Sequence, residues 1–285
     1  MTKTPMYLPS VFPAGPGGGN PAPIWLNADT LTSAQMQAMT KEQGYESGFV
    51  LTPQDPANHL RLRFFVPEHE MSMCGHATIG ALWVLRALGR LPAADTLRIE
   101  TASGLVTARV PADGGAIAIS QPWGIRAALA PEHLADLARV LNVEPEQVEE
   151  AANGCTSRVK TVIRLAHAEV LQRLEPDWNA VAALCETLDS TGLYPFAWGT
   201  DPWLVHARQF PRNSGYPEDA ATGIAAAALA CALSLAGQLP QPRGVLRVRQ
   251  GEAMGRPSEI EVEVDASARS CWIRGICTLE PEIAA

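Results

Sequence analysis

Two apolar helices, each opened by a run of small residues, constrain the fold of this 285-residue chain more than any other feature. The first is predicted to begin in Cys74-Gly75-His76-Ala77-Thr78 and to run to about Leu88. The second is predicted from Ile224 to about Leu235. A helix that is apolar on nearly every side is usually wrapped by other structure. Both segments are too short to span a bilayer, so we expect two buried helices.

Strand-like segments surround both helices in a similar order. Strands are predicted over 96–100, 105–110 and 116–120 after the first helix, and over 245–250, 260–264 and 271–278 after the second. Further strands are predicted over 60–64, 158–165 and 203–209, and further helices over 33–42, 131–141, 146–152 and 178–189. This is a coarse internal duplication. One helix followed by three strands indicates partly antiparallel sheets, so the sequence predicts an α+β fold whose halves meet near the two helix N-termini.

Composition narrows the class of protein. The chain is 47% hydrophobic and 18% charged, which is typical of a folded globular protein. A formal net charge of −8 with no long basic run makes nucleic acid or an anionic membrane a poor partner. Residues 1–10 do not have the pattern of a secretory signal. The six cysteines include no Cys-x-x-Cys pair, so we expect no disulfide framework and a cytoplasmic location.

The starts of the two apolar helices are candidate ligand sites. A helix N-terminus presents unpaired N–H groups and a partial positive charge, and it binds carboxylates readily. Gly75 and Gly223 would let a ligand approach the backbone closely. Two facing N-termini would form a pocket for a small acid. The alternative is that both glycines only allow tight packing of a central helix.

Four side chains could carry chemistry, and three of them stand beside the starts of the two apolar helices. Glu46 stands in Gly44-Tyr45-Glu46-Ser47-Gly48, and apolar surroundings would raise its pKa toward the range useful for proton transfer. His76 is a candidate proton carrier, and Cys74 a candidate acid or nucleophile whose pKa a helix N-terminus would lower. Asp219 lies just before the second helix. The plain alternatives are a surface glutamate, a helix-cap histidine, a core cysteine and a turn aspartate.

Several familiar signals are missing from the sequence. The run Gly15–Asn20 matches neither a dinucleotide fingerprint nor a P-loop. Gly44–Gly48 has the spacing of a nucleophile elbow but carries Glu46 at its centre in place of a serine. Cys74-x-His76 does not have the ligand spacing of a structural zinc site. We therefore predict neither a metal nor a nucleotide.

An ordered set of motifs across essentially the whole chain resembles the phenazine-biosynthesis PhzF-like isomerase family, a branch of the diaminopimelate-epimerase fold. The motifs are Gly19-Asn20-Pro21-Ala22, Glu46, Phe65-x-Pro67, Cys74-Gly75-His76-Ala77-Thr78, Glu218-Asp219-x-Ala221-Thr222-Gly223 and Gln250-Gly251-x-x-Met254-Gly255-Arg256-Pro257-Ser258.

The resemblance implies two pseudo-symmetric lobes, each a curved mixed sheet or barrel around a central helix, with the active site between them. We place the lobes at residues 1–121 and 122–285, with a last strand that crosses back to the first lobe. The resemblance also implies no cofactor and a homodimer. It assigns catalysis to Glu46, His76 and Asp219. The predicted substrate-binding residues are Asn20, Cys74, Gly75, Thr222, Gly223 and Ile224.

The chain departs from the family pattern at two positions. The family usually has Pro where Ala220 stands and a small hydroxyl residue where Ile224 stands. Ile224 cannot donate a side-chain hydrogen bond, which argues against assuming the phenazine-pathway substrate. Cys74 matches the first catalytic cysteine of the epimerases, but residues 218–224 hold no second one, so a two-thiol racemase is disfavoured.

The predicted function is therefore a cofactor-independent isomerase that moves a proton on a small carboxylic acid by general acid–base catalysis. Two alternatives remain open from the sequence. One is an amino-acid epimerase that uses Cys74 as a base. The other is a catalytically silent protein of the same fold that binds a small acid.

Overall fold

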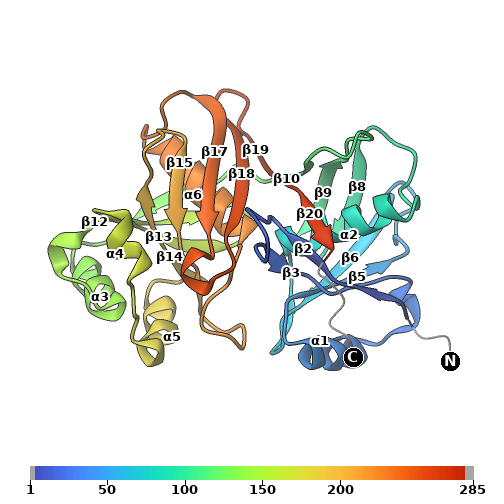
Figure 1. Cartoon of the computed structure of the whole chain (residues 1–285), viewed down its shortest axis with the longest axis horizontal. Helices are drawn as coiled ribbons and strands as arrows, with labels where there is room; N and C mark the ends of the chain where they lie inside the picture. Colours follow the sequence, from blue (N-terminus) through green and yellow to red (C-terminus); the bar gives the residue numbers. More distant parts are fainter. Residues whose placement is uncertain (1–3, 280–285) are drawn as a thin grey trace.

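The computed structural model describes residues 4–279 of the chain. Two parts lie side by side, each with a sheet that curves around one helix (Figure 1). This agrees with the predicted α+β class. The predicted boundary between residues 121 and 122 stays a prediction.

The first part is built on one mixed sheet. Its strands are hydrogen-bonded in the order β1, β4, β5, β6, β8, β9 and β10, with β7 paired to β6. Their bounds are Met6–Tyr7, Ile24–Trp25, Ser47–Leu51, Leu60–Phe65, Leu97–Thr101, Gly104–Arg109 and Ile117–Gln121, and β7 is Glu70–Met71.

The second part continues the same ladder. Its strands follow in the order β19, β18, β17, β15, β14, β13, β12 and β11, with β16 paired to β14. Their bounds are Ser270–Gly275, Ser258–Asp265, Arg243–Gln250, Leu204–Ala207, Gly192–Trp198, Val159–Leu165, Val148–Cys155 and Ile125–Ala128, and β16 is Phe210–Pro211.

The strand directions repeat between the two parts. From β4 to β10 the successive pairings are parallel, antiparallel, parallel, antiparallel and antiparallel. The same succession runs from β13 to β19. The two equivalent end strands, β10 and β19, then pair with each other antiparallel over five residues, from Ile117↔Gly275 to Gln121↔Cys271. The coarse duplication in the sequence is therefore a real repeat of topology.

A small second sheet ties the end of the chain to its beginning. Strand β20 (Cys277–Leu279) pairs antiparallel with β2 (Pro9–Val11), which also pairs with β3 (Asn20–Pro21). In Figure 1 the red arrow of β20 accordingly lies among the blue strands. This sheet fixes Asn20 beside the second part of the chain.

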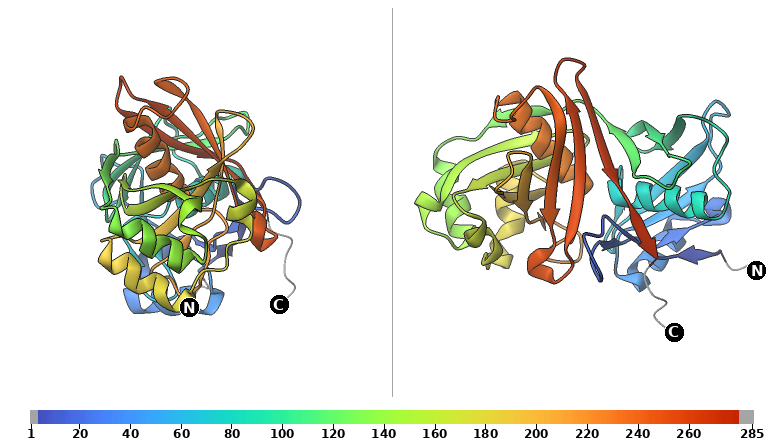
Figure 2. Two further views of the ribbon diagram at one scale, coloured as in Figure 1. Left: turned by 90° about the vertical axis from the view of Figure 1, so that its left-hand side faces the viewer. Right: turned by 45° about the horizontal axis from the view of Figure 1, so that its top comes forward.

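The two predicted apolar helices are α2 (Gly75–Ala87) and α6 (Gly223–Leu235), and each is wrapped by the strands of its own half (Figure 2). Every residue of α6 from Gly223 to Leu233 is buried. A Cβ built on Gly75 would lie 3.7 Å from the Cα of Gly223, so the first residues of the two helices are almost in contact. The predicted meeting of the helix N-termini is confirmed by this geometry.

The remaining helices lie on the outside. They are α1 (Ser33–Gln43), α3 (Glu132–Leu141), α4 (Ala168–Gln172) and α5 (Trp178–Thr187), with short 3-10 turns at Ala28–Thr30, Pro145–Gln147 and Glu252–Met254. Helix α1 starts as predicted, because Thr32 and Gln35 form a capping box. It also ends as predicted, because Gly44 adopts a positive φ of 73°.

One predicted element is wrong. Residues 146–152 were expected to be helical, but Val148–Cys155 forms strand β12 between β11 and β13. Glutamate, glutamine and alanine favour a helix, but this preference is a weak prior that tertiary pairing overrides. Val148, Ala151 and Ala152 are buried by that pairing.

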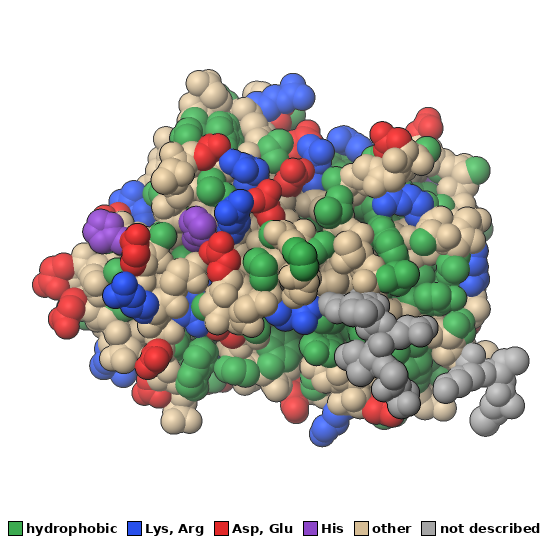
Figure 3. All heavy atoms as spheres, viewed as in Figure 1, with side chains coloured by type: hydrophobic (Ala, Val, Ile, Leu, Met, Phe, Trp, Pro, Cys, Tyr) green, Lys and Arg blue, Asp and Glu red, His purple; other side chains and the backbone are tan. Residues whose placement is uncertain are grey.

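The surface and the cysteines agree with a globular fold. Figure 3 shows acidic and basic side chains intermixed over β17–β19, where Arg249 pairs with Glu259 and Arg274 with Glu261. All six cysteines fall in the described part of the chain and all are free. Among the described residues, no helix has the length and hydropathy needed to cross a membrane.

Candidate active site

A small cavity lies where the two helix starts meet. Its volume is about 20 Å³, room for about one water molecule. Both halves contribute to its lining, which includes Glu46, Cys74, Gly75, His76, Arg158, Lys160, Thr191, Gln209, Tyr216, Asp219, Thr222, Gly223 and Ile224. An outer pocket of about 400 Å³ adjoins it and is also lined by Glu46, Tyr216 and Asp219, together with Asn20 and Ala220. The predicted residues are therefore gathered around one site.

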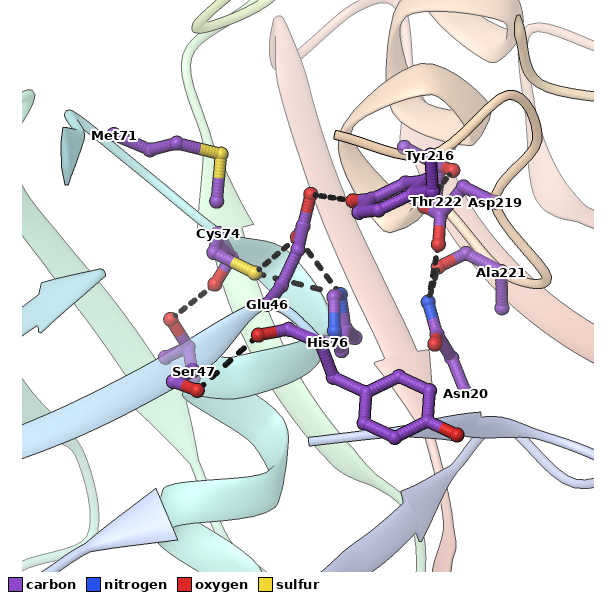
Figure 4. Close-up of polar contacts among 12 residues, drawn as sticks. Asn20, Glu46, Ser47, Met71, Cys74, His76, Tyr216, Asp219, Ala221 and Thr222 are labelled. Atoms are coloured by element: carbon purple, nitrogen blue, oxygen red, sulfur yellow. Dashed lines mark hydrogen bonds and ion pairs between the residues drawn. The ribbon is translucent and has the colours of Figure 1, made fainter. Parts of the chain in front are cut away.

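Glu46 stands at the centre of a hydrogen-bonded cluster (Figure 4). It lies one residue before β5, and the turn after α1 directs it toward the start of α2. The Cys74 thiol donates to its Oε2 at 3.0 Å, and the Tyr216 hydroxyl donates to its Oε1 at 2.7 Å. His76 Nδ1 lies 3.5 Å from Oε2 and 3.4 Å from the Cys74 sulfur. The carboxylate is thus held by donors from both halves of the chain.

These contacts reverse the expected pKa of Glu46. Burial is the largest single influence and raises the pKa, as predicted. The charge of His76 and the hydrogen bonds from Cys74 and Tyr216 act the other way, and the net pKa is lowered. The prediction of a raised pKa is therefore wrong. Glu46 is an ionised carboxylate, ready to accept a proton.

The expected pKa of Cys74 is also corrected. Burial, followed by the negative charge of Glu46, raises the pKa of this thiol well above its usual value of 9.0. Its position as N-cap of α2 does not offset those two effects. Cys74 is therefore a protonated hydrogen-bond donor and not a thiolate.

Asp219 is held by a second cluster across the cavity. Its carboxylate accepts from Asn20 Nδ2 at 2.6 Å and from the Thr222 hydroxyl. Its backbone carbonyl accepts from Gln250 Nε2 at 2.7 Å, and Gln250 Oε1 accepts from the buried Tyr194 hydroxyl at 2.9 Å. The Asn20 and Gln250 motifs therefore meet at Asp219, although they lie more than 200 residues apart in the chain.

The two carboxylates differ in their affinity for a proton. Burial, followed by the charge of Glu46, raises the pKa of Asp219 to about 6. Two carboxylates in one buried site cannot both ionise easily, so one retains its charge and the other binds a proton more readily. In this pair Glu46 retains its charge, and Asp219 has the higher affinity for a proton.

The remaining predicted residues line the same walls. His76 is buried, and its Nε2 has no hydrogen-bond partner among the described residues. Ile224 gives the inner cavity an apolar wall where a hydroxyl group was expected from the resemblance. Gly75 and Gly223 place the backbone N–H groups of both helix starts at the cavity. The roles assigned to these residues stay predictions.

Sequence reasoning missed five residues of this site: Tyr216, Gln250, Arg158, Lys160 and Gln209. Gln250 begins one of the motifs that resemble the family, but no local pattern indicates its role. Arg158 and Lys160 had a usable signal, because they alternate at the start of a correctly predicted strand and so share one face. Tyr216 had none, since its partner Glu46 is 170 residues away.

Glu46, Cys74 and His76 also form a compact set of donor atoms, all within 4.8 Å of one another. Thiolate, imidazole and carboxylate are the ligands that zinc prefers. In this site, however, the Cys74 proton lies between the sulfur and the carboxylate, which accounts for the short separations. The prediction that the site uses no metal stays a prediction.

Comparison with known proteins agrees with this geometry. A family profile described as "Phenazine biosynthesis-like protein" matches residues 10–280. The chain belongs to this PhzF-like family of isomerases. A Deinococcus radiodurans protein named an uncharacterized isomerase is 34% identical over 90% of this chain and 85% of its own length. A Pseudomonas aeruginosa trans-2,3-dihydro-3-hydroxyanthranilate isomerase is 31% identical over 90% of this chain and 88% of its own.

Solved structures of the family have the same fold. A Bacillus anthracis PhzF-family protein superposes with a TM-score of 0.86 at 25% identity, and covers 99% of this chain and 98% of its own. A hydroxyproline epimerase from Agrobacterium vitis superposes with a TM-score of 0.59 at 14% identity over 97% of this chain and 91% of its own, which shows a shared fold alone. The PhzF-like assignment made from the motifs is confirmed.

Proposed function

We propose that this PhzF-like isomerase moves a proton on a small carboxylic acid, with Glu46 as the base and without a cofactor. The observation that carries the proposal is the state of Glu46. Its side chain is 13% exposed and ionised, and it faces a cavity shared with an aspartate of raised pKa. A base and an acid with separated proton affinities are what general acid–base catalysis requires.

In the proposed reaction Glu46 accepts a proton from a carbon of the substrate and leaves the electron pair conjugated with the substrate's unsaturated or carboxyl group. The same carboxyl then returns the proton to another carbon, or to the same carbon from a different approach. The base thereby regains its ionised form, and atoms and charge balance. General acid–base catalysis typically contributes about 10²- to 10⁴-fold.

The remaining acceleration would come from charge stabilisation. The N-termini of α2 and α6 supply backbone N–H groups for the substrate carboxylate. His76 Nε2, which has no partner within the described chain, is available to the developing charge. The name of the Pseudomonas relatives, a dihydro-hydroxyanthranilate isomerase, supports an acid substrate for this chain too.

Cys74 fits a supporting role better than that of a base. Its raised pKa leaves it protonated, and its proton is already donated to Glu46. The epimerase alternative that uses a Cys74 thiolate is therefore disfavoured. Asp219 would assist by holding or delivering a proton on the opposite wall. A homodimer in the cytoplasm remains our expectation for the assembly and location.

The test is hydrogen exchange in heavy water. Trans-2,3-dihydro-3-hydroxyanthranilate and a panel of unsaturated and amino acids would be incubated with the protein, and deuterium at carbon followed by NMR and mass spectrometry. We expect incorporation with the wild type and its loss in Glu46→Gln. Glu42→Gln, an exposed glutamate on α1, is the matched control. Equal incorporation by the wild type and Glu46→Gln would refute the role of Glu46.

A further inference from the structure

The second half of the chain places an unpaired cation in the wall of the inner cavity. Arg158 immediately precedes β13 and Lys160 is the second residue of that strand, and this spacing of two places both side chains in the lining of the inner cavity. Lys160 is only 3% exposed. Its ammonium group makes no hydrogen bond or ion pair with any residue between positions 4 and 279. An isolated buried ammonium is costly, and it is normally paired when it is retained.

Gln209 is an unpaired neighbour of this cation. It is 1% exposed, and neither its Nε2 nor its Oε1 has a partner in the described part of the chain. A Cβ built on Gly192 would lie 2.3 Å from Gln209 Nε2 and 3.2 Å from Lys160 Nζ. The absence of a side chain at Gly192 is therefore what lets the amide and the ammonium lie together over the backbone of β14.

This pair lies next to the catalytic groups. The Asp219 N–H donates to the Gln209 carbonyl at 3.1 Å, so the two residues form an isolated antiparallel β-bridge. Burial, followed by the charge of Arg158, lowers the pKa of Lys160 to about 7. The charged and titratable groups that influence Lys160 are Arg158, Glu46, Asp219 and Cys185. The carboxylates among them raise the pKa but do not approach closely enough to pair with it.

A cluster of this kind lacks an anionic partner. An incoming carboxylate has two oxygens, one for the ammonium of Lys160 and one for the amide N–H of Gln209. It would also be attracted by Arg158, which makes a contact with the Met71 sulfur but no ion pair among the described residues. Such a ligand satisfies two buried groups, the ammonium of Lys160 and the amide of Gln209, that have no side-chain partner in the described part of the chain.

We propose that Lys160, Gln209 and Arg158 form a second carboxylate-binding subsite, so that the substrate of this isomerase is a dicarboxylic acid. The first carboxylate would lie at the starts of α2 and α6, and the second on this cluster, with Glu46 facing the carbon chain between them. This subsite extends the proposed function and depends on it only for the position of the first carboxylate. A diacid exceeds the inner cavity of about 20 Å³, so its binding requires the side chains that line this cavity to move apart.

Binding measurements can test the subsite directly. The probes are succinate, glutarate and adipate, each compared with its monomethyl ester, by isothermal titration calorimetry at pH 6.5. Hydrogen bonds between charged groups make a difference of about 10- to 100-fold in affinity. We expect at least one diacid to bind the wild type about tenfold or more tighter than its ester. In Lys160→Met that preference should disappear, while the affinity for the ester stays within about threefold.

Matched variants separate the subsite from general damage. Lys41→Met removes an exposed lysine from α1 and should keep the wild-type preference. Gln209→Leu should weaken diacid binding about tenfold, and it provides a second route if Lys160→Met fails to fold by circular dichroism. A preference for the diacid that survives Lys160→Met or Gln209→Leu would overturn the proposal. So would a wild type that binds no diacid more tightly than its ester. Inorganic phosphate that competes as strongly as the best diacid would also overturn it.

The experiments can refute the proposed subsite and the proposed catalytic base independently of each other. Glu46→Gln should lose deuterium exchange, and Lys160→Met should lose the diacid preference, because the base and the cluster make no hydrogen bond or ion pair with each other among the described residues. If Glu46→Gln exchanges normally while Lys160→Met loses the preference, the proposed base is wrong and the subsite stands. If Lys160→Met keeps the preference while Glu46→Gln is inactive, the subsite is wrong and the base stands.

Discussion

Replacing Asp219 with asparagine should make the protein more stable near neutral pH, and the gain should depend on pH in a predictable way. Burial, followed by the charge of Glu46, raises the pKa of Asp219 from its ordinary 3.8 to about 6 in the folded state. The folded state therefore binds this proton more tightly than the unfolded state does. The stability contributed by Asp219 is complete below about pH 3.8 and is lost as pH rises through about 6.

The size of the effect follows from these two values. At about 1.4 kcal/mol per pKa unit, the interval from 3.8 to about 6 corresponds to about 3 kcal/mol. About 2 kcal/mol of this is lost between roughly pH 4.5 and 7.5. An asparagine cannot ionise, and its side-chain oxygen can still accept from Asn20 Nδ2. The free energy of unfolding of Asp219→Asn relative to wild type should therefore rise by about 2 kcal/mol over that range.

The assay is urea unfolding followed by circular dichroism at pH 4.5, 6.0 and 7.5. Asp95→Asn, an exposed aspartate, is the control and should show no such pH-dependent difference. In a Glu46→Gln background the effect should shrink, because the charge of Glu46 contributes to the raised pKa of Asp219. Parallel stability curves for Asp219→Asn and wild type would show that the buried aspartate ionises freely, which would refute this reasoning.

Three further outcomes are expected. Tyr216→Phe removes a hydrogen bond that lowers the pKa of Glu46, so the acid limb of the pH profile of kcat/KM should move to higher pH. An unchanged pH profile would contradict the effect of this hydrogen bond on Glu46. Cys74→Ala should retain solvent-deuterium exchange at a rate reduced about tenfold or less, whereas complete loss would assign proton transfer to the thiol. Arg208→Met leaves Glu218, whose side chain is only 10% exposed, without its bidentate partner, so the free energy of unfolding from urea titration should fall by about 3–5 kcal/mol. A decrease below about 1 kcal/mol would contradict a strongly coupled pair.

The central helices of the fold could be predicted from sequence because their signals are local. The apolar runs after Gly75 and Gly223 need burial whatever surrounds them, and glycine or small residues mark their ends. Strand β14 could not be predicted in the same way. It contains Pro195, which lacks a backbone donor and argues against a central strand, yet it lies between β13 and β15. Its assignment depends on partners distant in the chain.

The site shows a similar division. The resemblance selected Glu46, but the direction of its pKa depended on Tyr216, a donor that no local pattern connects to it. The sequence predicts correctly that Lys160 lies in a strand. That its ammonium group packs over Gly192 without a charged partner can be learned only from the structure. Motifs therefore identified which residues matter, while charge states and unpaired groups required the three-dimensional arrangement.

The antiparallel pairing of β10 with β19 has an evolutionary meaning. These strands hold equivalent places in the two repeats, so the halves are related as the subunits of a twofold-symmetric dimer joined along one strand edge. A fused dimer no longer has to keep its two sites identical. Glu46 stands one residue before β5, and Thr191 stands at the matching position before β14. The two halves therefore share a topology but differ in chemistry, because an ionised glutamate stands at one of these equivalent positions and a neutral threonine at the other.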